Sequence, residues 1–89
     1  MAYMLVRNKV RDFAVWKDVF DSEFGPAREA GLGLVHLWRS TENPNEVFFL
    51  LSITDMDRAR AFTTAPSSAA AGERAGVLEG EIHYVEDVP

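Results

Sequence analysis

The chain contains no cysteine, which excludes disulfides, thiolate nucleophiles and cysteine-ligated metal sites. It has two histidines, and their positions suggest no metal site with neighbouring carboxylates. The net charge is −5 and basic residues form no block, which argues against a nucleic-acid partner. No apolar run approaches the roughly 20 residues of a membrane span, and the short apolar start lacks a signal-peptide pattern. We therefore expect a cytoplasmic protein that binds no metal, membrane or nucleic acid.

What the sequence does contain is one unbroken apolar run, between Glu46 and Thr54. A strand with one face in water alternates apolar and polar residues, whereas an unbroken run predicts a strand covered on both faces. A chain of 89 residues has enough helix to cover only one face of a small sheet. We therefore predict a homodimer in which a second copy covers the other face.

Apolar periodicity, capping residues and turn residues place the other elements. Strands are predicted at 2–10, 34–40 and 81–86, and helices at 13–24, 26–31, 55–65 and 67–75. Asp12 and Asp55 are the expected helix caps, and Gly76 is the expected end of the last helix. Gly25-Pro26 is expected to interrupt the first helix, which is predicted to continue with a kink over 26–31.

The resulting order, β-α-β-β-α-β, predicts a ferredoxin-like α+β fold in a single domain, 1–89. Its four antiparallel strands would carry the helices on one face only. Two bare apolar faces packed together would form a dimeric α/β barrel.

Several short motifs support a resemblance that covers nearly the whole chain. They are the turn from Asn43 to Val47, the helix start Asp55-x-Asp57-x-Ala59-Arg60-Ala61-Phe62, Asp12-Phe13-x-x-Trp16-Lys17, and Arg74-Ala75-Gly76-Val77. Together with the element order they resemble small dimeric α+β-barrel proteins, the relatives of antibiotic-biosynthesis monooxygenases and cyclase-like barrels. The resemblance implies a ligand cavity between sheet and helices, which in some members holds flat aromatic molecules. The monooxygenase branch oxidises them without metal or flavin, and a related branch degrades haem.

The resemblance also implies site residues, since in several members an Asn on the first strand, a Trp and a His form the site. Asn8 matches in type and place. Trp16 and Trp38 lie at other positions than the family's Trp, and no His lies between Pro66 and Gly76. These differences argue against haem degradation, and no cofactor is expected.

Individual residues carry both functional and structural interpretations. His36 can act as acid or base, or serve as a structural histidine, and Asn8 can hold a substrate oxygen or mark a strand end. The expected substrate-contacting residues are Trp38, Tyr84, Phe49 and His83, with dimer packing as the alternative for Trp38 and a structural role as the alternative for Tyr84. Trp16 is expected in the core.

These observations predict a small-molecule-binding dimeric barrel. Its function would be that of a cofactor-independent monooxygenase, or a cyclase or isomerase, acting on an aromatic or polyketide-like substrate. One alternative is a non-catalytic binding or stress-related module, and another is a structural dimer whose pocket is filled by its own side chains.

Overall fold

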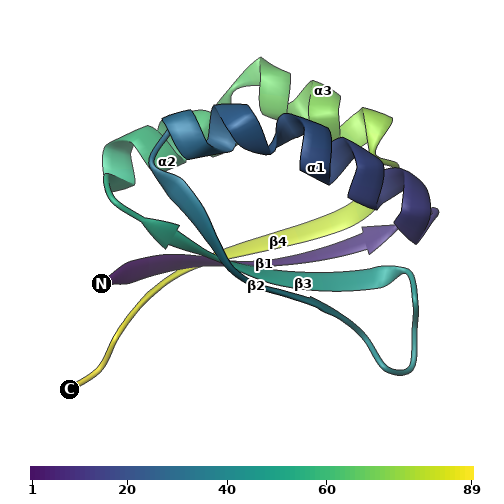
Figure 1. Cartoon of the computed structure of the whole chain (residues 1–89), viewed down its shortest axis with the longest axis horizontal. Helices are drawn as coiled ribbons and strands as arrows, with labels where there is room; N and C mark the ends of the chain where they lie inside the picture. The colour runs from purple at the N-terminus through teal and green to yellow at the C-terminus, as the bar shows by residue number, and fades with distance from the viewer.

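The computed structural model describes all residues from 1 to 89 and contains four strands and three helices (Figure 1). In chain order they are β1 (Ala2–Val10), α1 (Phe13–Glu29), β2 (Leu32–Arg39), β3 (Glu46–Ile53), α2 (Met56–Thr64), α3 (Pro66–Arg74) and β4 (Val77–Glu86). The predicted order is confirmed, with the second helical segment in two pieces.

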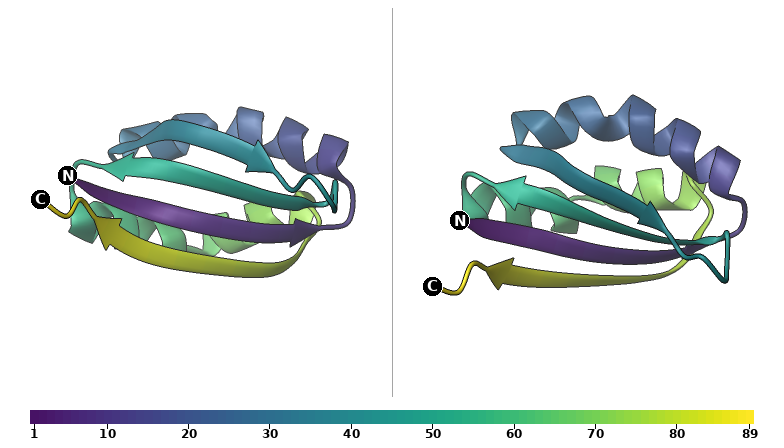
Figure 2. Two further views of the ribbon diagram at one scale, coloured as in Figure 1. Left: turned by 90° about the horizontal axis from the view of Figure 1, so that it is seen from below. Right: turned by 60° about the horizontal axis from the view of Figure 1, so that its bottom comes forward.

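The strands form one antiparallel sheet in the order β2-β3-β1-β4. All three helices lie on the same face of this sheet, with α1 over β2 and β3 and with α2 and α3 over β1 and β4 (Figure 2). This is the predicted ferredoxin-like arrangement, and it leaves one face of the sheet without cover.

The unbroken apolar run of β3 arises because its successive side chains lie on opposite faces of the sheet. Val47, Phe49, Leu51 and Ile53 are buried beneath the helices, while Phe48 and Leu50 between them point to the opposite face. The buried set joins Met4, Val6 and Val10 of β1 in the hydrophobic core. Since successive strand residues alternate between faces, one strand contributes to both surfaces.

Helix α1 begins at the predicted cap, where the Asp12 carboxylate accepts from the Ala14 N–H at 2.9 Å. The expected break at Pro26 is wrong, because the helix continues through it to Glu29. Proline removes one backbone hydrogen bond, but the last turn is held by the buried Ala27 and by the Ala30 N–H, which donates to the Pro26 carbonyl at 3.1 Å.

Two strands begin earlier than predicted. Strand β2 starts at Leu32, which pairs with Ile53 and is 2% exposed. Strand β4 starts at Val77, and its pairing with β1 continues through Gly80 opposite Asn8. Backbone pairing does not require an alternating side-chain pattern, so reading the alternation in the sequence made both predicted strands too short.

The sheet face without helices is termed the open face. Its side chains include Leu5 and Arg7 of β1, His36 and Trp38 of β2, Phe48 and Leu50 of β3, and Glu81 and His83 of β4. Trp38 is 46% exposed. None of the three helices has the length and hydrophobicity needed to cross a membrane.

Candidate functional site

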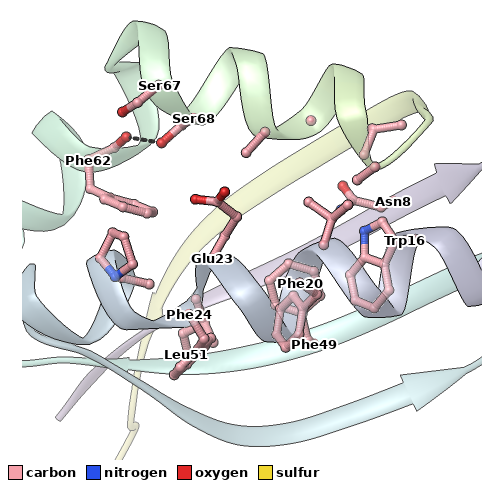
Figure 3. A pocket seen from close by; sticks show the side chains of 17 residues that line it. Asn8, Trp16, Phe20, Glu23, Phe24, Phe49, Leu51, Phe62, Ser67 and Ser68 are labelled. Atoms are coloured by element: carbon pink, nitrogen blue, oxygen red, sulfur yellow. Dashed lines mark hydrogen bonds between the residues drawn. The ribbon is translucent and has the colours of Figure 1, made fainter.

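A cavity of about 280 Å³ lies between the sheet and the helices, in the place that the family resemblance implied (Figure 3). Residues from β1, β3, β4, α1, α2 and α3 line it, and 11 of the 17 are hydrophobic. A concave, mainly apolar space with a few polar groups is typical of a small-molecule site. We term it the first cavity.

One side of the first cavity is an aromatic wall, formed by Trp16, Phe20 and Phe24 of α1 and Phe49 of β3. The three helix residues recur every fourth position and so project from one side of α1. The ring centroids of Trp16 and Phe20 lie 4.7 Å apart, and those of Phe20 and Phe49 lie 5.2 Å apart. Contacting rings present a continuous apolar surface to any ligand.

The opposite side is formed by helix α3 and its C-cap, which present only small residues: Ser67, Ser68, Ala71, Gly72 and Ala75. Their spacing places them on one face of the helix. A Cβ atom built on Gly72 would meet nothing within 4 Å. The cavity therefore exists because α3 has no side chain long enough to reach the aromatic wall.

Asn8 provides a side-chain amide within this apolar lining, and Trp16 fixes its orientation. In the amide orientation that satisfies both neighbours, Oδ1 accepts from the Trp16 Nε1–H at 3.2 Å and Nδ2 donates to the Arg7 carbonyl at 3.1 Å. Gly80 lies opposite Asn8 across the strand pair, and a Cβ there would lie 3.3 Å from the amide atom that is Nδ2 in this orientation. One Nδ2 proton is left to donate to a ligand, because an amide nitrogen has two.

Glu23 is the single titratable side chain among the residues that line the first cavity. It belongs to α1, and its carboxylate is turned toward α3 (Figure 3). There it forms an ion pair with Arg74 of α3. This pair links the two helices beside the cavity, and both side chains remain partly exposed. A carboxylate at this place can accept a proton from a bound molecule.

The structure brings only two of the predicted site residues to the first cavity, Asn8 and Phe49. His36 and Trp38 lie together on the open face, where their rings stack at 4.9 Å. His83 is on the same face and is exposed, with Nε2 3.5 Å from a Glu81 carboxylate oxygen.

Tyr84 lies on the helix side of the sheet, but its hydroxyl is 3.1 Å from the Thr63 hydroxyl and it does not line the cavity. His36 and Asn8 are thus on opposite faces, and the expected catalytic pair of these two residues is not assembled within one subunit.

Two residues at the cavity were not singled out as functional from the sequence. Trp16 is 2% exposed, as its core prediction requires, yet its indole N–H also bonds to Asn8. Glu23 follows the solvent-facing pattern of α1 and gave no signal of its own. No group of three His, Asp or Glu side chains is placed to hold a metal ion.

The open face carries a charged cluster as well as apolar side chains. The guanidinium of Arg7 lies 2.8 Å from Glu46, 3.4 Å from Glu81 and 3.9 Å from Glu79. The Glu46 hydrogen bond is the main reason why the pKa of Arg7 is raised, and the neighbouring negative charges add to it. The charge of Arg7 is thus balanced by carboxylates of β3 and β4.

No protein-family model matches the sequence, and no curated protein does. Solved structures do match over nearly the whole chain. A proposed antibiotic biosynthesis monooxygenase from Bordetella bronchiseptica aligns with a TM-score of 0.81 at 16% identity, covering 99% of this chain and 97% of the other. A second proposed member, from Caulobacter crescentus, gives 0.75 at 21% identity over 99% of this chain and 90% of the other.

A variant of SnoaB, described as a cofactor-independent oxygenase from Streptomyces nogalater, gives a TM-score of 0.74 at 21% identity over 97% of this chain and 91% of the other. At such identities the likeness shows fold alone. The chain adopts the ferredoxin-like fold of the antibiotic biosynthesis monooxygenase-like proteins.

Proposed function

We propose that this protein binds an aromatic small molecule in the first cavity and oxidises it with dioxygen without a bound cofactor. The observation that carries the proposal is the Asn8–Trp16 pair, which places one oriented amide in a mainly aromatic and aliphatic lining. The neighbour described as a cofactor-independent oxygenase supports the same reaction class.

The free Asn8 proton favours a ligand that carries a carbonyl or phenolate oxygen next to its ring. Trp16 holds Oδ1, and the Arg7 carbonyl holds one proton of Nδ2. The amide therefore acts toward a ligand chiefly as a donor, and a preoriented donor stabilises negative charge that develops on oxygen.

Glu23 is the proposed base. Removing a proton from a phenol or from the activated methylene beside it makes the substrate electron-rich enough to react with dioxygen. Conversion of that methylene to a carbonyl with release of water balances in atoms and electrons without a further reductant. Glu23 lines the cavity and can take up the first proton. A cyclase or isomerase would use the same proton transfer without consuming oxygen.

The proposal includes a homodimer in which a second copy covers the open face. Leu5, Phe48, Leu50 and Trp38 form its apolar part, and the cluster around Arg7 forms its polar part. A contiguous apolar face of this kind indicates an interaction surface. Sedimentation velocity across a concentration series tests the association directly.

The first experiment uses the Trp38→Phe protein, in which Trp16 is the remaining indole. Quenching of its fluorescence by phenol reports occupation of the first cavity. Asn8→Ala should raise the dissociation constant about twofold to tenfold, the effect of one hydrogen bond. Asn43→Ala, in the turn between β2 and β3, is the matched control and should leave it unchanged.

Measuring oxygen uptake then distinguishes an oxygenase from a cyclase or isomerase. With hydroxylated anthrones as test substrates, the oxygenase consumes oxygen and Glu23→Gln abolishes the uptake. Product formation without oxygen uptake would identify a cyclase or isomerase.

A binding module without catalysis is the second candidate, because the first cavity has no histidine in its lining. Ligand binding with neither oxygen uptake nor product would establish that function and overturn the enzymatic one. The cavity itself, about 280 Å³ in volume, argues against an interior filled by the protein's own side chains.

A further inference from the structure

A second cavity of about 350 Å³ adjoins the first beneath α3. The two share the lining residues Asn8, Phe49, Leu51, Phe62, Ser68, Gly72 and Val77. The second cavity extends from these toward β4, where Gly80 and Ile82 line it. Ile82 is 44% exposed although it lies on the helix side of the sheet, which shows that α3 leaves this edge uncovered.

The two cavities differ in the chemistry of the residues that they do not share. The first has the rings of Trp16, Phe20 and Phe24. The second has aliphatic side chains and methionine, namely Met4, Val6, Leu32 and Ile82. Flat rings pack well against aromatic side chains, while flexible chains pack well against aliphatic ones.

Asn8 and Gly72 lie at the junction, since both line both cavities. Gly72 leaves open space where a side chain would otherwise separate the two. The amide of Asn8 is thus available to a polar group carried by a ligand that spans the junction.

We propose that one ligand occupies both cavities, namely a phenol or quinone ring that bears an alkyl chain. The ring lies against the aromatic wall, its oxygen accepts from Asn8, and the chain extends under α3 toward β4. This inference rests on the proposed function, since it assigns the substrate class of the same site.

The test uses phenol and its para-propyl, para-pentyl and para-heptyl derivatives as quenchers of Trp16 in the Trp38→Phe protein. Each methylene that leaves water should tighten binding about fourfold, until the chain fills the second cavity. An affinity that does not rise with chain length overturns the inference.

Two substitutions on α3 form a matched pair. Ala69 lines only the second cavity and Ala71 only the first. Ala69→Leu should cut the gain per methylene to less than about twofold while phenol itself binds as before. Ala71→Leu should weaken the binding of phenol itself but keep the gain in affinity per added methylene. Leucine is nearly as good a helix former as alanine, so neither change should unfold α3, and circular dichroism checks this.

The possible failures are distinguishable. If Ala71→Leu removes the chain-length gain and Ala69→Leu does not, the chain lies in the first cavity and the inference is wrong while the proposed site stands. If no member of the series quenches Trp16, the proposed aromatic site and the inference are both overturned.

Discussion

Apolar side chains lie on both faces of the sheet, but they pack under the helices on one face and lie without helical cover on the other. On the covered face, Val6 and Phe49 pack with the helices around one amide, that of Asn8. On the open face, Leu50 and Phe48 have no helix above them and stand next to Arg7 and its carboxylate partners. Apolar character alone therefore does not locate the cavity. The cavity lies where the element above the sheet, α3, has side chains too small to fill the space.

The largest expected difference between the two faces is the loss of folding stability when a phenylalanine on each face is replaced by alanine. Phe49→Ala should lower the free energy of unfolding by about 3–5 kcal/mol, because it removes a ring from the core. Phe48→Ala should cost less, and its cost should grow with protein concentration, because an interface residue stabilises by association. Urea unfolding at several concentrations measures both. A Phe48 effect that is large and independent of concentration would contradict the dimer.

Association itself is tested by placing a charge on the open face. Leu50→Asp should weaken the dimer about a hundredfold or more, because an unpaired carboxylate would be buried from each copy. Val15→Asp is the control, since Val15 is 48% exposed on α1. Analytical ultracentrifugation should show a monomer for the first variant and an unchanged dimer for the second. If both variants associate equally, the interface does not lie on the open face.

The two tryptophans allow the same change on each face. Trp16→Phe removes the donor to Asn8 and should lower the free energy of unfolding by about 1 kcal/mol. Trp38→Phe should change it by less than about 0.5 kcal/mol in the monomer, since Trp38 is partly exposed and stacks only on His36. Differential scanning calorimetry compares them. Equal losses would mean that the indole hydrogen bond contributes nothing.

A smaller effect is expected from the ion pair beside the first cavity. Arg74→Ala should change stability by less than about 1 kcal/mol, because the pair with Glu23 is partly exposed. It should raise the rate at which phenol quenches Trp16 if the pair hinders entry. Lys17→Ala removes the Lys17–Asp21 pair elsewhere on α1 and is the stopped-flow control. Equal rates in both variants would exclude a role of the pair in ligand entry.

The smallest effect concerns Tyr3 on the open face. Partial burial and then the charge of Asp87 raise the pKa of Tyr3 above its ordinary value. Because the folded-state pKa exceeds the unfolded one, the contribution of Tyr3 is complete below about pH 10 and is lost as the pH rises through the folded value. Absorbance titration in a Tyr84→Phe background follows Tyr3 alone. Asp87→Asn should lower its pKa, and an unchanged titration would contradict the assigned cause.

The sequence predicts the fold well because its signals are local and periodic. The apolar run of β3, the caps Asp12 and Asp55, and Gly76 with its φ of 75° act within a few residues. The strand face that Asn8 shares with Met4 and Val6 was predicted for the same reason, because side chains two residues apart in a strand lie on the same face.

The lining of the cavity was predicted only in part, because it depends on which face of each strand meets the helices. Both faces of β2 carry apolar residues, so alternation could not tell on which side His36 lies, and the irregular register between Leu34 and His36 shifts the pattern further. Glu23 lies on a helix beside exposed residues and becomes part of a cavity only through the approach of α3. Such proximity between distant segments leaves no trace in periodicity.

The small side chains of α3 have a consequence for how this scaffold changes over evolution. None of the nine residues of α3 is buried, so substitutions there cost little folding energy, in contrast to those in β1 and β3. Yet several of them, Gly72 above all, line the two cavities. New ligand preferences can therefore arise by single replacements in one short helix, while the rest of the chain is preserved.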